Sequence, residues 1–169
     1  APPSPAINAA RIVLARMLID TGNSVGARAQ VEEVLANDST HVEATKLKAA
    51  WLIEDDETDA AVALLRAALG QSPRDAELMT LLARAHERNG NPELMADMLA
   101  LAVEASGSAP DESLRYATHL SGNGKGIAAE GILLDALRLQ PENIRLLSAL
   151  GALYIDLEDW GRARGSIDR

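Results

Sequence analysis

Apolar residues recur along this chain at the spacing of amphipathic helices, in paired stripes with a short polar turn inside each pair. In the first pair, Leu14 and Leu18 belong to one stripe, and Ala27, Val31 and Val34 belong to the next. The turns are rich in Gly, Asn and Asp, which cap helices or tolerate left-handed backbone. Aromatic residues make up only 2% of the chain, which disfavours sheet architectures. The spacing predicts helices over residues 8–20, 24–36, 41–54, 58–70, 75–88, 92–105, 110–121, 126–139, 143–157 and 160–168.

This pattern repeats every 34 residues without an insertion. In frames that start at residues 8, 42, 76, 110 and 144, the eighth place always holds a small residue: Ala15, Ala49, Ala83, Ala117 and Gly151. A small side chain lets two helices cross closely. One helix pair cannot bury its own apolar face, so we expect adjacent pairs to stack. The predicted organisation is a Pro- and Ala-rich stub over 1–7, then one array over 8–169 with repeats 8–41, 42–75, 76–109, 110–143 and 144–169, the last one truncated.

Other places in the frame agree, and local signals mark some helix starts. The twentieth place is small in every frame except at Met95, and the twenty-fourth is always apolar. Asn91-Pro92-Glu93 has the order of an N-cap, a first-turn proline and a first-turn acid. Thr40-His41-Val42-Glu43 has the spacing of a capping box, which predicts that Thr40 and Glu43 cap the third helix.

The 34-residue pattern resembles the tetratricopeptide repeat (TPR) family, and the resemblance covers residues 8–169. It is best in the last frame, where the residues that match are Leu147, Leu150, Gly151, Tyr154, Ala163 and Ile167. Lys48, His86 and Met95 depart from the family pattern. The resemblance implies an all-α fold, a right-handed α-solenoid of about five helix-turn-helix repeats, from a bacterial protein. Because the chain stops inside the fifth repeat, we expect a fragment of a longer protein, whose uncapped C-terminal end either mediates self-association or continues into more repeats.

In that family the first helix of each repeat lines a concave groove that holds a protein or peptide. The resemblance places these residues at the centre of the groove: Ile12, Arg16, Lys46, Ala50, Thr80, Arg84, Leu114, Thr118, Ser148 and Ala152. Three of the ten are basic and none is acidic, in a chain of net charge −9, so they favour an acidic or mixed apolar and acidic peptide. The alternative is that Arg16, Lys46 and Arg84 pair with acids at the rim, namely Asp20, Glu43 and Glu87.

Charge and residue types narrow the chemistry further. A net charge of −9 repels phosphate backbones, so nucleic acid is not an expected partner. Gly122-Asn123-Gly124-Lys125-Gly126 lacks the spacing and the Ser or Thr of a P-loop. The three histidines are too scattered for a metal site, and cysteine is absent. No apolar run is long enough for insertion into a membrane. We expect no enzyme activity, no cofactor and no metal.

The function predicted from these observations is a scaffold for protein–protein interaction in assembly or secretion. A Pro- and Ala-rich start and more Arg than Lys favour a bacterial cell envelope, while periplasm and cytoplasm both stay open. Two alternatives remain at this point. One is a substrate-selecting repeat module attached to an enzyme, and the other is a structural or oligomerisation spacer.

Overall fold

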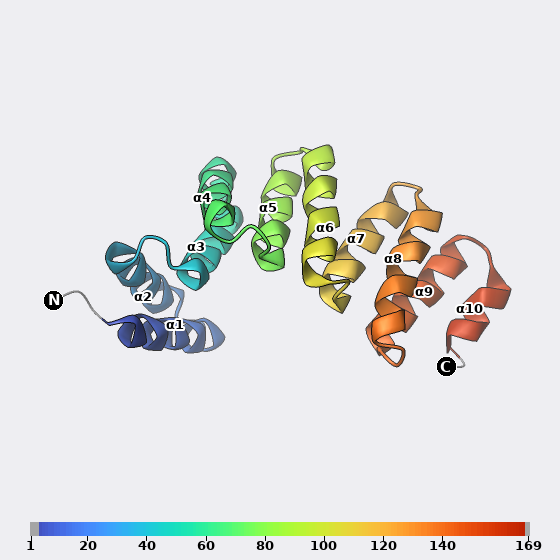
Figure 1. Ribbon diagram of the computed structural model, residues 1–169, viewed down its shortest axis with the longest axis horizontal. Helices are drawn as coiled ribbons and strands as arrows, with labels where there is room; N and C mark the ends of the chain where they lie inside the picture. Colours follow the sequence, from blue (N-terminus) through green and yellow to red (C-terminus); the bar gives the residue numbers. More distant parts are fainter. Residues whose placement is uncertain (1–3, 168–169) are drawn as a thin grey trace. The chain divides into compact units, whose positions relative to one another are not determined.

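A computed structural model describes residues 4–167, and every regular element in that range is an α-helix (Figure 1). The helices are α1 (Pro5–Asp20), α2 (Ser24–Asn37), α3 (Val42–Glu54), α4 (Thr58–Gln71), α5 (Ala76–Arg88), α6 (Pro92–Ser106), α7 (Pro110–Gly122), α8 (Gly126–Leu139), α9 (Ile144–Asp156) and α10 (Trp160–Ile167). The predicted all-α fold of about five helix-turn-helix repeats is confirmed.

Nine of the ten predicted helix starts lie within one residue of the observed start, and the first does not. Helix α1 begins at Pro5, three residues before its predicted start at Asn8. Ser4 precedes it in an extended conformation, with φ −67° and ψ 156°. Proline is well suited to the first helical position, because the N–H that it lacks would have no partner there and its φ is already helical. The helix therefore extends into the segment expected to be a stub.

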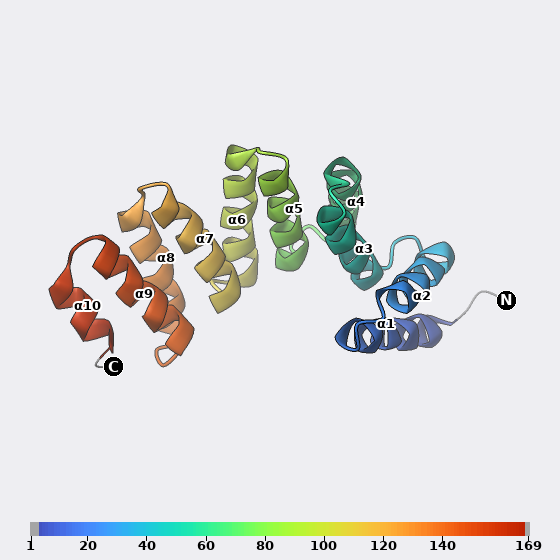
Figure 2. The ribbon, with the colours of Figure 1, turned by 180° about the vertical axis from the view of Figure 1, so that it is seen from behind.

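The described chain divides into two compact units. The first unit comprises residues 4–73 and 81–92, and the second comprises residues 74–80 and 93–167, so that each contains part of α5. A buried cluster holds α1, α2 and α3 together in the first unit: Ile12, Ala15, Ala27, Val31, Val34 and Ala44. A larger one joins α7 to α10 in the second: Ala117, Leu120, Ala129, Leu133, Ala136, Leu137, Leu146, Leu150, Leu153, Tyr154 and Ala163. Figure 2 shows α7 to α10 side by side from behind.

The eighth place of the frame is a packing position, as predicted. Ala15, Ala49, Ala83, Ala117 and Gly151 are all buried. The requirement at the last of these is for a small residue and not for glycine itself. A Cβ added to Gly151 would lie 3.8 Å from the Cβ of Ser166, which is an ordinary contact.

The turn inside each pair uses one backbone device. The fifteenth place of every frame has a positive φ: Gly22, Asp56, Gly90, Gly124 and Glu158. The next residue then donates its N–H to the carbonyl five residues earlier, for example Asn23 to Leu18 at 2.8 Å and Asp159 to Tyr154 at 2.8 Å. This is the Schellman arrangement that closes a helix C-terminus. The sequence pattern predicted these turns, but it did not show that Asp56 and Glu158 adopt the left-handed conformation.

The predicted capping box at the start of α3 is wrong. The N-cap residue is His41, whose Nδ1 accepts the N–H of Ala44 at 3.3 Å. Thr40 instead donates its hydroxyl to Asp38 at 2.8 Å, and this bond lowers the pKa of the Asp38 carboxyl. The carboxylate of Glu43 lies against two cations, which it binds more strongly than a neutral backbone N–H.

His86 occupies the buried position predicted for it. It is only 4% exposed, and no described group bonds its Nδ1. Burial, with a smaller contribution from Arg66, lowers the pKa of this imidazole. Within residues 4–167 no helix is long and apolar enough to cross a membrane, and no cluster of three potential metal ligands occurs.

Candidate binding faces

The structure places all ten predicted groove residues on the first helices of the repeats. Four of them lie on α1 and α3, two on α5, and four on α7 and α9. Ile12, Lys46 and Thr80 are buried, and Ile12 belongs to the core of the first unit. Ala50 and Leu114 are half-buried, and the exposed members are Arg16, Arg84, Thr118, Ser148 and Ala152. The described residues therefore offer two separate candidate faces, one on α1 and α3 and the other on α7 and α9.

On the α1–α3 face, one carboxylate joins two of the predicted cations. Arg16 Nη2 lies 2.5 Å from Glu43 Oε2, and Lys46 Nζ lies 3.0 Å from Glu43 Oε1. The Lys46 side chain is mostly buried, while that of Arg16 is 56% exposed. Arg16 and Lys46 therefore form the ion pairs with a nearby acid that were one of the two alternatives from the sequence. Arg84 makes no ion pair within residues 4–167.

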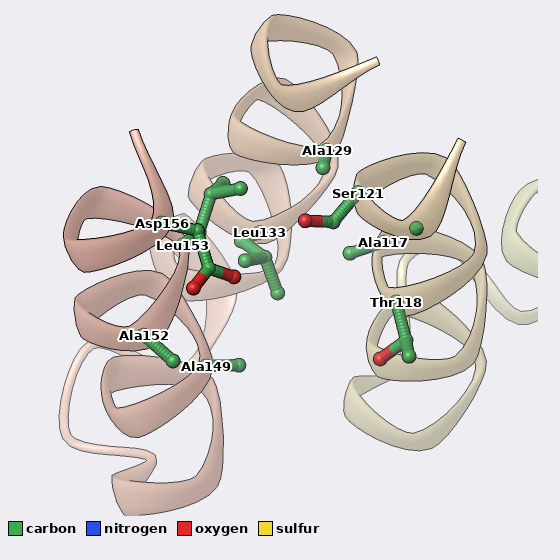
Figure 3. Close-up of a pocket in the computed structure, with 10 residues that line it drawn as sticks. Ala117, Thr118, Ser121, Ala129, Leu133, Ala149, Ala152, Leu153 and Asp156 are labelled. Atoms are coloured by element: carbon green, nitrogen blue, oxygen red, sulfur yellow. The ribbon is translucent and has the colours of Figure 1, made fainter. Parts of the chain in front are cut away.

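On the α7–α9 face, the two helices border an open cavity of about 390 Å³ with α8 behind it (Figure 3). Most of its lining is small or apolar. The lining residues are Ala117, Thr118, Ser121, Gly122, Ala129, Leu133, Ala149, Ala152, Leu153 and Asp156. Two predicted groove residues, Thr118 and Ala152, thus border the same cavity from opposite helices. Asp156 and Ser121 were not predicted from the sequence.

One end of this cavity is electronegative. Asp156 is the last residue of α9, and Ser121 and Gly122 end α7, so both helix C-termini reach the lining. Each helix C-terminus carries a partial negative charge, on the order of half an elementary charge. Asp156 is exposed and forms no ion pair with any residue that the structure describes. Its carboxylate points toward the cavity in Figure 3.

The hydroxyl of Thr118 adds to this polarity. It donates a hydrogen bond to the carbonyl of Leu114 at 2.8 Å, so its donor is already used and its oxygen remains an acceptor. An apolar cavity with a carboxylate, a hydroxyl acceptor and two helix C-termini at its edge can hold an aliphatic stem with a cationic head. Position at the end of a helix is the sequence signal that could have identified Asp156, since a carboxylate is unfavourable there.

A partly buried network of three side chains joins α8, α9 and α10. Tyr154 donates its hydroxyl to Glu130 Oε1 at 2.8 Å, and Arg162 Nη1 lies 2.6 Å from the same oxygen. The Arg162 guanidinium also stacks 4.5 Å from the centroid of the Tyr154 ring. Burial, followed by the bond to Glu130, raises the pKa of Tyr154. The three side chains come from α8, α9 and α10, so the network joins these helices.

Comparison with known proteins gives one sequence match and many structural ones. Residues 52–107 match the sequence model of the tetratricopeptide repeat. No curated protein sequence matches the chain.

Three solved structures illustrate the structural similarity. A structure of MamA is 16% identical, with 98% of this chain and 88% of that one covered and a TM-score of 0.68. PilF of Pseudomonas aeruginosa is 18% identical, with 96% and 74% covered and a TM-score of 0.76. YrrB, described as a TPR protein with an unusual peptide-binding site, is 18% identical, with 94% and 81% covered and a TM-score of 0.64.

Identities this low establish the shared fold alone. That fold extends over nearly the whole chain, and the repeat's own sequence signature lies within it at residues 52–107. Residues 52–107 therefore match the tetratricopeptide repeat in sequence, and the chain as a whole shares the fold of tetratricopeptide-repeat proteins.

Proposed function

We propose that the chain is a binding module for a partner polypeptide, and that the partner lies along the exposed faces of the first helices. The observation that carries this proposal is the cavity between α7 and α9, into which the predicted groove residues Thr118 and Ala152 both face. A peptide-binding site in YrrB, which has the same fold, supports the choice of ligand class.

The chemistry of the cavity selects a lysine or arginine side chain of that partner. The aliphatic stem would lie against Ala117, Ala149 and Leu133, and the cationic head would approach Asp156. A carboxylate that already had a basic neighbour would gain little from such a contact. Asp156 has none within residues 4–167, so a cation from the partner would meet it without competition.

Replacement of Asp156 by Asn tests this proposal. The ligands are three fluorescent peptides that have the same apolar flanking residues and carry Lys, Gln or Glu at the central position. Fluorescence anisotropy should show the Lys peptide binding most tightly to the unmodified chain. Asp156→Asn should weaken that peptide about five- to tenfold and leave the Gln peptide unchanged, since an exposed charge-assisted contact contributes on the order of 1 kcal/mol.

The matched control is Glu104→Gln, because Glu104 is an exposed carboxylate of the second unit that does not line the cavity. Equal loss of the Lys peptide in both variants would indicate general electrostatic attraction and would reject a site at Asp156. A chain that binds none of the three peptides would favour the structural spacer.

The acidic partner expected from the sequence is proposed only for the α1–α3 face. There Arg16 and Lys46 share Glu43, so an acidic peptide must compete with an internal carboxylate. Arg16 is the more accessible of the two cations and is the group that such a peptide would meet first.

Replacement of Glu43 by Gln should therefore strengthen binding of the Glu peptide, by about threefold to fivefold, because Arg16 loses a competing carboxylate. The added change Arg16→Glu should abolish this gain. Glu32→Gln is the control, because this substitution removes the same charge from the same unit, and Glu32 pairs with Lys48 and not with Arg16. Unchanged affinity in Glu43→Gln, or an equal gain in Glu32→Gln, would contradict a role for Arg16.

A further inference from the structure

Helix α1 has an apolar face that no described residue covers. The residues of this head face occupy the third, sixth, seventh and tenth places of the frame: Ala10, Val13, Leu14 and Met17. Met17 is 60% exposed and Val13 is 59% exposed, and none of the four is charged. A contiguous apolar patch of this kind on a soluble protein marks an interaction surface.

The third, sixth, seventh and tenth places of the fifth repeat show which surface these positions contact inside the array. In α9 they hold Leu146, Ala149, Leu150 and Leu153. The three leucines are at most 4% exposed, and they lie in the cluster that α9 forms with α7 and α8. The third, sixth, seventh and tenth places thus form the side of a first helix that packs on the preceding helix pair.

The opposite surface, onto which a following first helix would pack, is exposed on α9 and α10. We call this surface the tail face. It borders an open cavity of about 620 Å³, and its residues are Glu142, Ile144, Leu147, Ser148, Gly151, Ala152, Ile155 and Ser166. Ile144 is 77% exposed and Ile155 is 46% exposed. The equivalent places of α7 include Ser113, Leu114 and Ala117, which are buried or half-buried beside α9.

We infer that the head face of one copy of this chain packs into the tail face of another, as α9 packs on α7 and α8. The partner is a second copy, because the head face is continuous in frame and in residue type with an interface that the fold already contains. The head face and the tail face follow the same 34-residue frame, so two copies can pack in the arrangement that adjacent repeats already use. The contact is heterologous, and each copy can therefore engage two others at the same time. This inference does not depend on the proposed peptide site.

Two single substitutions and their mixture test the inference. The average mass of the chain is measured by sedimentation equilibrium over a wide range of concentrations. The unmodified chain should exceed the mass of a dimer as its concentration rises. Met17→Glu and Ile155→Glu should each remain at the mass of one chain, 17.9 kDa. Both side chains are exposed, so neither change disturbs the core.

An equimolar mixture of the two variants is the decisive arm. Met17→Glu retains an intact tail face and Ile155→Glu retains an intact head face, so the mixture should recover a dimer and stop there. Ile127→Glu is the matched control, because Ile127 is 86% exposed and lies on neither face; this variant should associate like the unmodified chain.

Three results would overturn the inference. The first is an unmodified chain that stays monomeric at every concentration. The second is association of Ile155→Glu with itself as strong as that of the unmodified chain, which would indicate pairing of two head faces. The third is a mixture that remains monomeric, which would mean that head and tail faces do not contact each other.

Discussion

Replacing Leu146 by Ala should lower the free energy of unfolding of the second unit by about 2–5 kcal/mol. Leu146 has no exposed surface, and it packs in the cluster that joins α7, α8 and α9. Its loss removes apolar contacts and leaves a cavity that the surrounding helices cannot fully close. The cost should be larger than for most single substitutions, because this residue lies where one helix pair stacks on the next.

Urea denaturation followed by circular dichroism measures this effect, and amide hydrogen exchange identifies the helices that lose protection. We expect faster exchange in α8, α9 and α10 and little change in α1 and α2. Leu139→Ala is the control, because Leu139 is 65% exposed at the end of α8. A loss below 1 kcal/mol in Leu146→Ala, or one equal to that of the control, would contradict the stacking of helix pairs around this residue.

The second large effect is expected from an added side chain at Ala15. This residue has no exposed surface and lies in the core of the first unit, at the eighth place of its frame. Ala15→Leu inserts three carbon atoms where helices approach closely, and it should destabilise the first unit by about 1–3 kcal/mol through displaced backbone and strained rotamers.

Thermal unfolding compares this variant with Ala36→Leu, which adds the same atoms at an exposed place on α2. Only the buried substitution should lower the unfolding temperature. A stability for Ala15→Leu at or above that of the unmodified chain would mean that the eighth place tolerates large residues. The small residues at the eighth place of all five repeats would then not be explained by the close crossing of two helices.

The helices could be predicted because each depends on spacing within one frame. Ala15, Ala49, Ala83 and Ala117 recur at intervals of 34 residues, and a helix pair forms around each of them. Contacts between particular side chains of different repeats were only partly predicted, since pairing of the groove cations with acids at the rim was one of two alternatives and the sequence did not decide between them. Glu43 has the spacing of a capping residue, but its carboxylate binds Arg16, which lies 27 residues away in the sequence.

The candidate binding faces were predictable to a smaller extent. The family resemblance selected first-helix places, and it led to Thr118 and Ala152 at the cavity between α7 and α9. It also selected Ile12, which is part of the core, because a place in the frame does not show how deeply a side chain lies. Asp156 was missed: its position at the end of α9 was a signal in the sequence, but the cavity that it borders also depends on the end of α7, which the sequence did not place beside it.

The most direct test of the central claim is a map of backbone amide chemical shifts during titration with the Lys peptide. If the peptide binds the α7–α9 face, the largest chemical-shift changes should occur at Thr118, Ala152 and Asp156, and those of the exposed residues of α8 and α10 should be smaller. Changes confined to α8 and α10, or no changes at saturating peptide, would contradict binding at this face.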